Sequence, residues 1–194
     1  RNLKTDYLDL YQLHNPDGLP GGDCCEELYD ALLEAKKAGK VRFIGITNHR
    51  ADIIRKAVES GLYDTVQFPF SHLSSDEDLM IVEECKKHDI GFLAMKAMAG
   101  GLITNASAAF AFMRRFDNVL PLWGIQRETE LGEFLAMEAS SHLLEDDGIK
   151  SAIERDRAEL SGNFCRGCGY CMPCPADIPL NFASRMVDVL NRLP

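Results

Sequence analysis

The sequence predicts an α/β fold with a parallel sheet, and three observations support this prediction. Segments with strand character alternate with segments with helix character, five times at a spacing of roughly thirty residues. Strands such as VRFIGI are continuously apolar, as in sheets covered on both faces. No GxGxxG motif follows a strand, so the fingerprint of an open dinucleotide-binding sheet is missing. A doubly wound open sheet and part of an eight-stranded β/α barrel remain the two candidate architectures.

Five strands and five helices make up this pattern. The strands are expected at residues 7–13, 41–47, 65–70, 90–98 and 119–125. The helices are expected at residues 25–40, 51–61, 75–89, 106–116 and 128–144. Apolar residues recur at helical spacing in the first of these helices, and Gly39 fits its stop. Gly61 closes the second helix, and Ser75 opens the third before a run of acidic residues.

The pattern changes after residue 144. Residues 145–163 are polar and helical, four cysteines follow in CRGCGYCMPCP, and residues 178–193 form a short amphipathic helix. We therefore expect two parts: residues 1–144 as the β/α part and residues 145–194 as a small cysteine-rich helical module. The chain opens inside a predicted strand, so we expect further sequence upstream.

The composition is that of a chain long enough for one core. Hydrophobic residues make up 46% of the 194 residues, and the formal net charge is -9. An acidic balance gives no support for nucleic-acid or anionic-membrane partners. The sequence has no run of eighteen apolar residues, so no membrane-spanning helix is expected. It has seven cysteines but no secretory signal, so a disulfide scaffold is not expected. A reducing cytoplasm suits thiolate ligands.

Polar side chains cluster where the predicted strands end. They are His14-Asn15, Thr47-Asn48-His49, Gln67, Lys96 and Gln126-Arg127. In a β/α barrel the active site is built at the carboxyl ends of the strands, so five polar ends together favour a shared site.

The cysteine cluster has metal-ligand spacing. Cys165, Cys168, Cys171 and Cys174 are each separated by two residues, and Pro175 follows. Thiolates bind iron–sulfur clusters or zinc. Bacterial ferredoxins have a gap of three before their last cysteine, so their ligand assignment does not transfer directly. Zinc sites usually have two separated CxxC pairs, so zinc is the rival of an iron–sulfur cluster. The fourth ligand of a cluster would be either Cys174 or a residue from elsewhere in the protein.

Several segments resemble the aldo/keto reductase family. TDYLDLYQLHNPD resembles the fourth barrel strand, EAKKAGKVRFIGITNH the next helix and the fifth strand, TVQFPFS the following strand, and VLPLWGIQRETELGEF the last strand and its loop. FCRGCGYCMPCP resembles the tail of a subgroup that carries an iron–sulfur motif, and this resemblance favours [4Fe–4S] over zinc. The resemblance covers nearly the whole chain and implies strands four to eight of a (β/α)8 barrel.

This resemblance implies a role for each candidate residue. His14 would be the catalytic histidine that contacts the substrate carbonyl, and Thr47, Asn48 and Gln67 would hold the nicotinamide carboxamide. The remaining cofactor-binding candidates are Lys96, Gly124, Gln126 and Arg127. Arg127 would pair with a 2′-phosphate, which favours NADP over NAD.

The function that follows is an NAD(P)H-dependent reduction of a small carbonyl compound, or oxidation of an alcohol, with a possible redox partner acting through the cluster. The family's Asp, Tyr and Lys have no counterparts in this chain, and Met95 takes a position that is often aromatic. We therefore expect the chain to be inactive alone. The alternative is a non-catalytic electron-transfer module or a zinc-stabilised binding module.

Overall fold

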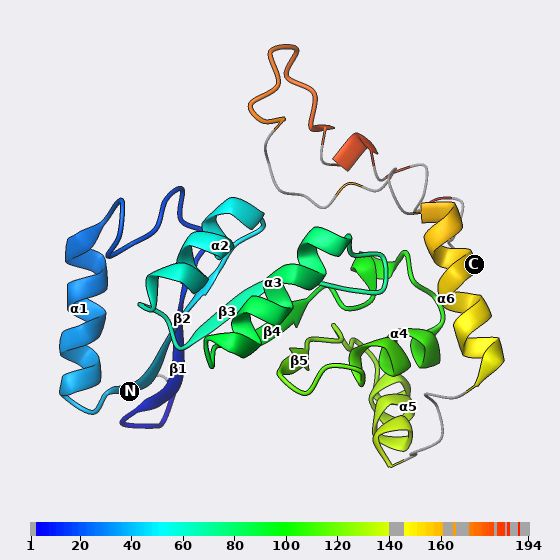
Figure 1. The fold of residues 1–194 in the computed structure, drawn as a ribbon, viewed down its shortest axis with the longest axis horizontal. Helices are drawn as coiled ribbons and strands as arrows, with labels where there is room; N and C mark the ends of the chain where they lie inside the picture. Colours follow the sequence, from blue (N-terminus) through cyan, green and yellow to red (C-terminus); the bar gives the residue numbers. More distant parts are fainter. Residues whose placement is uncertain are drawn as a thin grey trace. The chain divides into compact units, whose positions relative to one another are not determined.

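The computed structural model describes residues 3–139, 146–160, 165, 171–180, 182–184, 186 and 190. The chain divides into two compact units (Figure 1). Unit 1 comprises Arg1–Phe68 and Leu79–Leu93, and unit 2 comprises Pro69–Asp78 and Ala94–Pro194. Each unit is described below by itself.

The predicted strands all form, in one sheet whose order follows the chain, β1-β2-β3-β4-β5. They are β1 (Leu8–His14), β2 (Val41–Thr47), β3 (Thr65–Pro69), β4 (Gly91–Met95) and β5 (Val119–Pro121). β1 pairs with β2, and β2 with β3, in parallel. A doubly wound sheet reverses its strand order at a switch point. The sequential order therefore favours the barrel-type arrangement.

Two strands are shorter than predicted. β4 ends at Met95 because Lys96 has a left-handed backbone, with φ 56°, and a turn follows. β5 ends at Pro121 instead of residue 125, and Gly124 in the following segment also has a positive φ, of 70°. Both segments are mostly apolar, so the sequence analysis predicted continuous strands and missed these turns.

The helices form at the predicted places. They are α1 (Glu26–Lys37), α2 (Ala51–Ser60), α3 (Asp76–Lys87), α4 (Ala106–Met113), α5 (Glu128–Glu138) and α6 (Asp147–Leu160), with a short 3-10 turn at Ala99–Gly101. Gly39 and Gly61 have positive φ where α1 and α2 end, as expected of helix stops. The Asp78 carboxylate accepts hydrogen bonds from the Ser75 N–H and hydroxyl, so Ser75 opens α3 as predicted.

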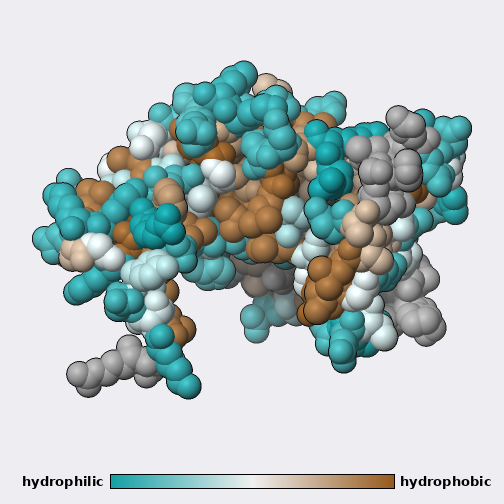
Figure 2. Space-filling model, turned by 90° about the horizontal axis from the view of Figure 1, so that it is seen from below, coloured by the Kyte–Doolittle hydropathy of each residue, from teal (hydrophilic) through white to brown (hydrophobic). Residues whose placement is uncertain are grey.

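In unit 1 the residues of β2 differ in burial. Ile44 and Ile46 are almost completely buried, and α1 and α2 both pack against β2 (Figure 1). Phe43 points to the opposite face, and 45% of it is exposed. Phe43 is not unusual in this respect, because Figure 2 shows other hydrophobic residues at the surface of the molecule among hydrophilic ones. The core of unit 1 therefore lies between the sheet and its helices.

In unit 2 helix α4 packs against both α5 and α6. Buried His72, in the segment after β3, lies 2.9 Å from Asp156 of α6 through its Nε2. Arg157 Nε donates to the His72 carbonyl oxygen, and its guanidinium lies over the Phe112 ring. His72 is therefore a core residue, and it helps to attach α6 within unit 2. The predicted boundary at residue 145 stays a prediction.

The cysteine-rich segment is described only in part. Cys165 and Cys174 are half-buried, Cys171 is exposed, and Cys168 lies outside the described residues. Residues 180, 182–184, 186 and 190 are helical, within the predicted helix 178–193. Among the described residues, no helix is long and apolar enough to span a membrane.

Candidate active site at the strand ends

Three predicted site residues of unit 1 form a row across adjacent strands. His14 is the register partner of Thr47, and Thr47 is the register partner of Gln67. Partners in a parallel ladder share one face of the sheet, so His14, Thr47 and Gln67 lie side by side on β1, β2 and β3. We call these three residues the strand-end row. His14 is exposed, whereas Thr47 is buried, so the imidazole is the accessible member.

Asn48 directly follows Thr47, and its side chain makes hydrogen bonds to the backbone of the segments that follow β1 and β2. Its side-chain amide donates to the Pro16 carbonyl oxygen at 2.8 Å, and its side-chain oxygen accepts from the Arg50 N–H at 2.9 Å. Asn48 is 1% exposed. Both ends of the side chain are thus occupied by backbone groups, which is a loop-stabilising role and leaves little of Asn48 for a ligand.

The amide of Gln67 is held by a residue that the sequence analysis did not single out. Gln12 Nε2 donates to Gln67 Oε1 at 2.9 Å, between β1 and β3. The intervening strand has Gly45 there, where a Cβ would collide with Thr65 Oγ1 and lie 3.0 Å from Gln12 Cγ. Gly45 therefore leaves the space through which Gln12 reaches Gln67. The strand alternation that places Gln12 on the same face as His14 was the available signal.

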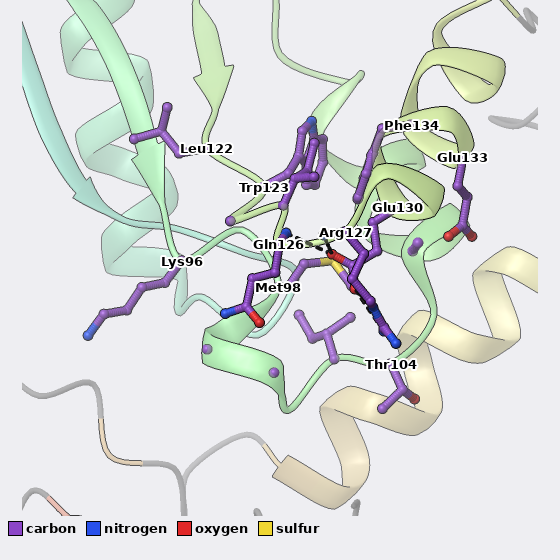
Figure 3. A pocket seen from close by; sticks show the side chains of 16 residues that line it. Lys96, Met98, Thr104, Leu122, Trp123, Gln126, Arg127, Glu130, Glu133 and Phe134 are labelled. Atoms are coloured by element: carbon purple, nitrogen blue, oxygen red, sulfur yellow. Dashed lines mark hydrogen bonds and ion pairs between the residues drawn. The ribbon is translucent and has the colours of Figure 1, made fainter. Parts of the chain in front are cut away.

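Unit 2 contains a cavity of about 760 Å³ that includes the remaining predicted site residues (Figure 3). Lys96, Gly124, Gln126 and Arg127 all line it. One wall is aromatic: Trp123 stacks on Phe134, with ring centroids 4.6 Å apart, and on Phe110 at 5.9 Å. An apolar wall with a few polar groups is the usual character of a small-molecule site.

The start of α5 forms a charged edge of this cavity. Glu130 accepts hydrogen bonds from the backbone N–H groups of Gln126 and Arg127 at 2.9 and 3.2 Å. The Arg127 guanidinium also lies 2.8 Å from Glu130, as the dashed lines in Figure 3 show. We call Gln126, Arg127 and Glu130 the α5 rim. The Gln126 N–H and the Arg127 guanidinium lower the pKa of Glu130, so it is ionised near neutral pH.

Lys96 lies on the other side of the cavity, after β4. Its left-handed backbone is uncommon for a residue with a side chain, and such conformations concentrate at functional sites. In Figure 3 its side chain extends away from Glu130. Met95, at the position that the resemblance makes aromatic, is buried, with 9% exposure.

The cysteines outside the tail have different environments. Cys85 is fully buried in α3, and burial raises its pKa to about 12, so the prediction that it is a core residue is confirmed. Cys24 is half-buried, and burial raises its pKa as well. Within the described residues, which omit Cys168, no group of three or more His, Cys, Asp or Glu side chains is arranged to hold a metal ion.

Glu130 is the other site residue that the sequence analysis missed. Its signal was present, because a glutamate three residues after the first cap position is typical of a helix start. The strand-end row was predicted because polar residues at strand ends stand out against apolar strands. Glu130 instead looked like one of several acidic residues in a polar helix.

Comparison with known proteins agrees with the fold. Residues 1–148 match the model of the aldo/keto reductase family. The chain is 36% identical over 107 residues to the uncharacterized oxidoreductase YqkF of Bacillus subtilis, covering 53% of this chain and 32% of that protein. It is 35% identical over 103 residues to the methylglyoxal reductase DkgB of Salmonella typhimurium, covering 52% of this chain and 38% of that protein.

A solved structure shows the same fold. An aldo-keto reductase from Klebsiella pneumoniae in complex with NADPH matches with a TM-score of 0.61 and 19% identity, covering 79% of this chain and 60% of that chain. The matches to YqkF and DkgB span about a third of the length of those relatives. The parallel sheet in sequential order and the family match over residues 1–148 together show that this chain belongs to the aldo/keto reductase family of oxidoreductases.

Proposed function

We propose that the protein reduces an aldehyde or ketone with NAD(P)H, and that the strand-end row forms part of its active site. The observation that carries this proposal is the register of β1, β2 and β3, which aligns His14, Thr47 and Gln67 on one face. Family membership supports an oxidoreductase, and the name of the similar DkgB supports a small carbonyl substrate.

Each member of the strand-end row suits one part of this reaction. When bound, a reduced nicotinamide would supply a hydride to the carbonyl carbon, and the proton for the carbonyl oxygen would come from the Tyr of the family's tetrad, which has no counterpart in these residues. The His14 imidazole can donate a hydrogen bond to that oxygen as negative charge develops on it. The Thr47 hydroxyl and the Gln67 amide have the donors and acceptors that a carboxamide needs. The Gln12 hydrogen bond fixes the amide of Gln67 for this purpose.

We further propose that the cavity of unit 2 binds a phosphate-bearing adenosine nucleotide. Its volume of about 760 Å³ is adequate for part of such a ligand. Lys96 and Arg127 supply positive charge, and the stack of Trp123 on Phe134 supplies an aromatic wall.

The cysteine tail is proposed to bind one [4Fe–4S] cluster through Cys165, Cys168, Cys171 and Cys174. The donor set fits, since all four residues are cysteines separated by two residues each, and soft thiolates select iron–sulfur clusters or zinc. The cluster would supply single-electron transfer to a redox partner, or attach the tail to the rest of the protein. Such thiols are kept reduced in the cytoplasm, which we propose as the location.

The catalytic role of His14 is tested in the product of the complete gene, because the family's Asp, Tyr and Lys have no counterparts in these 194 residues. NAD(P)H oxidation by methylglyoxal and other aldehydes is expected, and His14→Ala should lower kcat by about 10²–10⁴-fold. His88→Ala is the matched control, because His88 is an exposed residue after α3. The proposal fails if no carbonyl compound is reduced, or if both variants retain full activity. Turnover by the 194-residue chain alone would contradict the expectation that it is inactive.

The cluster is tested by anaerobic purification with iron, sulfide and zinc measured per chain. About four iron and four sulfide are expected, with a brown absorption band that dithionite bleaches. Cys171→Ser should lower the iron content, whereas Cys85→Ser, in the buried core, should retain it. About one zinc in a colourless protein would contradict the cluster and favour a structural zinc clamp.

A further inference from the structure

Two adjacent cysteines, Cys24 and Cys25, lie on the loop between β1 and α1. They are the only cysteines of the sequence that are direct neighbours, and they belong neither to the strand-end row nor to the cysteine-rich tail. Cys25 is exposed, and Cys24 is half-buried. Two neighbouring thiols can do what a single thiol cannot, because they can close to a disulfide within the loop.

The loop holds Cys24 in a defined position. The Asp23 carboxylate accepts hydrogen bonds from the Leu19 N–H at 2.5 Å and from the Lys56 ammonium group at 2.7 Å. The Cys24 N–H donates to the Leu19 carbonyl oxygen at 3.2 Å. A Cβ added at Gly18 would lie 3.0 Å from Cys24 Sγ. Gly18 therefore leaves the space that the Cys24 thiol occupies.

The backbone of Cys25 brings its thiol to the side of Cys24. In an extended chain, adjacent side chains point to opposite sides. Cys25 instead has φ 50° and ψ 42°, a left-handed conformation that is uncommon for a residue with a side chain. The positive φ rotates its Cβ about the N–Cα bond, away from the extended arrangement. Burial and a hydrogen bond with the Cys25 thiol raise the pKa of Cys24, so the two sulfur atoms already meet.

The two thiols differ in what they can do first. Cys25 is exposed, so an oxidant in solution can reach its sulfur. Cys24 is half-buried, and its raised pKa keeps it protonated near neutral pH, which makes it a poor initial nucleophile. Cys24 is nevertheless in place to attack Cys25 once that sulfur carries a leaving group.

We propose that Cys24 and Cys25 form a redox site at which a hydroperoxide oxidises the pair to a vicinal disulfide. The Cys25 thiolate attacks one hydroperoxide oxygen, the O–O bond breaks, and the leaving oxygen takes up the proton that Cys25 released. Cys25 becomes a sulfenic acid. The Cys24 sulfur then forms the S–S bond, and the sulfenic oxygen leaves as water with the Cys24 proton. The two sulfurs together lose two electrons, and the hydroperoxide gains them.

The resulting disulfide would be easy to reduce. Adjacent Cα atoms are about 3.8 Å apart, whereas disulfides usually join Cα atoms about 4.4–6.8 Å apart, so the small ring is strained. Strained or exposed disulfides are the labile ones. Two exchange steps with a small thiol would return both cysteines to thiols and release the disulfide of the small thiol. The pair is therefore suited to reversible oxidation on the loop that leads from His14 to α1.

Tryptic peptide mapping separates this pair from all other cysteines. Trypsin cleaves after Lys4 and Lys36 and releases residues 5–36, whose only cysteines are Cys24 and Cys25. The product of the complete gene is reduced, exposed to hydrogen peroxide, alkylated with iodoacetamide and digested. Mass spectrometry should find this peptide with two hydrogen atoms fewer and without alkyl groups. Dithiothreitol added before alkylation should restore two alkylated cysteines.

Single substitutions separate the two roles. In Cys24→Ser the Cys25 sulfenic acid lacks its partner thiol, so dimedone should trap it. In Cys25→Ser the remaining Cys24 should react with peroxide about tenfold more slowly than Cys25 does in Cys24→Ser, because it is half-buried and protonated. Cys85→Ser, in the buried core of α3, is the matched control and should still form the disulfide.

Several results would overturn this redox site. They are two alkylated cysteines in residues 5–36 after peroxide treatment, a link from this peptide to a peptide of the cysteine-rich tail, or an alkylated Cys24 beside a Cys25 oxidised beyond the sulfenic acid. Equal peroxide reactivity of the two single variants would overturn the order of attack. The wild-type peptide decides whether the disulfide forms even if a variant does not fold. This chemistry needs neither the nicotinamide nor the cluster, so its failure would leave the proposed function untouched.

Discussion

The strand-end row lies where three strands end, whereas the α5 rim lies where a helix begins, and the two are held in position by different forces. The strand-end row is positioned by backbone register, because β1, β2 and β3 pair in parallel and put His14, Thr47 and Gln67 at one level. The α5 rim is positioned by a single carboxylate, since Glu130 collects the donors of Gln126 and Arg127.

This difference has consequences for stability and for specificity. A register is shared by many backbone hydrogen bonds, so one surface substitution cannot shift it. A helix cap depends on a few side-chain contacts, so one substitution can change both its charge and its donors. We therefore expect the strand-end row to respond to core substitutions, and the α5 rim to respond to pH and to changes of single charges.

The largest effect is expected from Ile46→Ala in β2. Ile46 is completely buried beside Thr47, and loss of its side chain should leave a cavity that lowers the free energy of unfolding by about 2–5 kcal/mol. Phe43→Ala is the matched control on the opposite face of β2, where 45% of the residue is exposed, and should cost about 1 kcal/mol or less. Urea denaturation of both variants measures the two values. Equal losses would mean that the buried Ile46 contributes no more to stability than the partly exposed Phe43.

A smaller effect is expected from Gly45→Ala, which acts on the strand-end row directly. The added methyl group would collide with Thr65 and crowd Gln12, so we expect a loss of about 1–3 kcal/mol from overpacking. The hydrogen bond from Gln12 to Gln67 should also be lost, which amide NMR signals of the two side chains would show. Gly132→Ala, where nothing lies within 4 Å of an added Cβ, is the control. An unchanged pair of amide signals in Gly45→Ala would contradict the role of Gly45.

The smallest effect is expected from the pH dependence of the α5 rim. The pKa of Glu130 is lowered in the folded state, so its contribution is present above the ordinary glutamate pKa of about 4.3 and is lost as pH falls through the folded value. The difference in melting temperature between wild type and Glu130→Gln should therefore shrink on acidification from neutral pH. A difference that is constant down to low pH would show that the charge of Glu130 does not stabilise the rim.

Much of the fold was predictable because its signals are local. Alternation of apolar strands with amphipathic helices identified all five strands, and glycine identified the ends of α1 and α2. The end of a strand was harder to predict where the apolar composition continues beyond the point at which the backbone leaves the sheet. The apolar run of residues 119–125 reads as a strand, but the ladder stops at Pro121. The backbone turns at Gly124, whose φ is 70°, so the apolar pattern continues beyond the end of the strand.

The sequence by itself determined which residues stand at the strand ends, because alternation along a strand assigns each side chain to a face. Only the tertiary structure decided which of them meet: Gln12 pairs with Gln67 across 55 residues of sequence, through the space left at Gly45. Hydrogen bonds are directional and short, so their partners depend on positions that no local pattern contains.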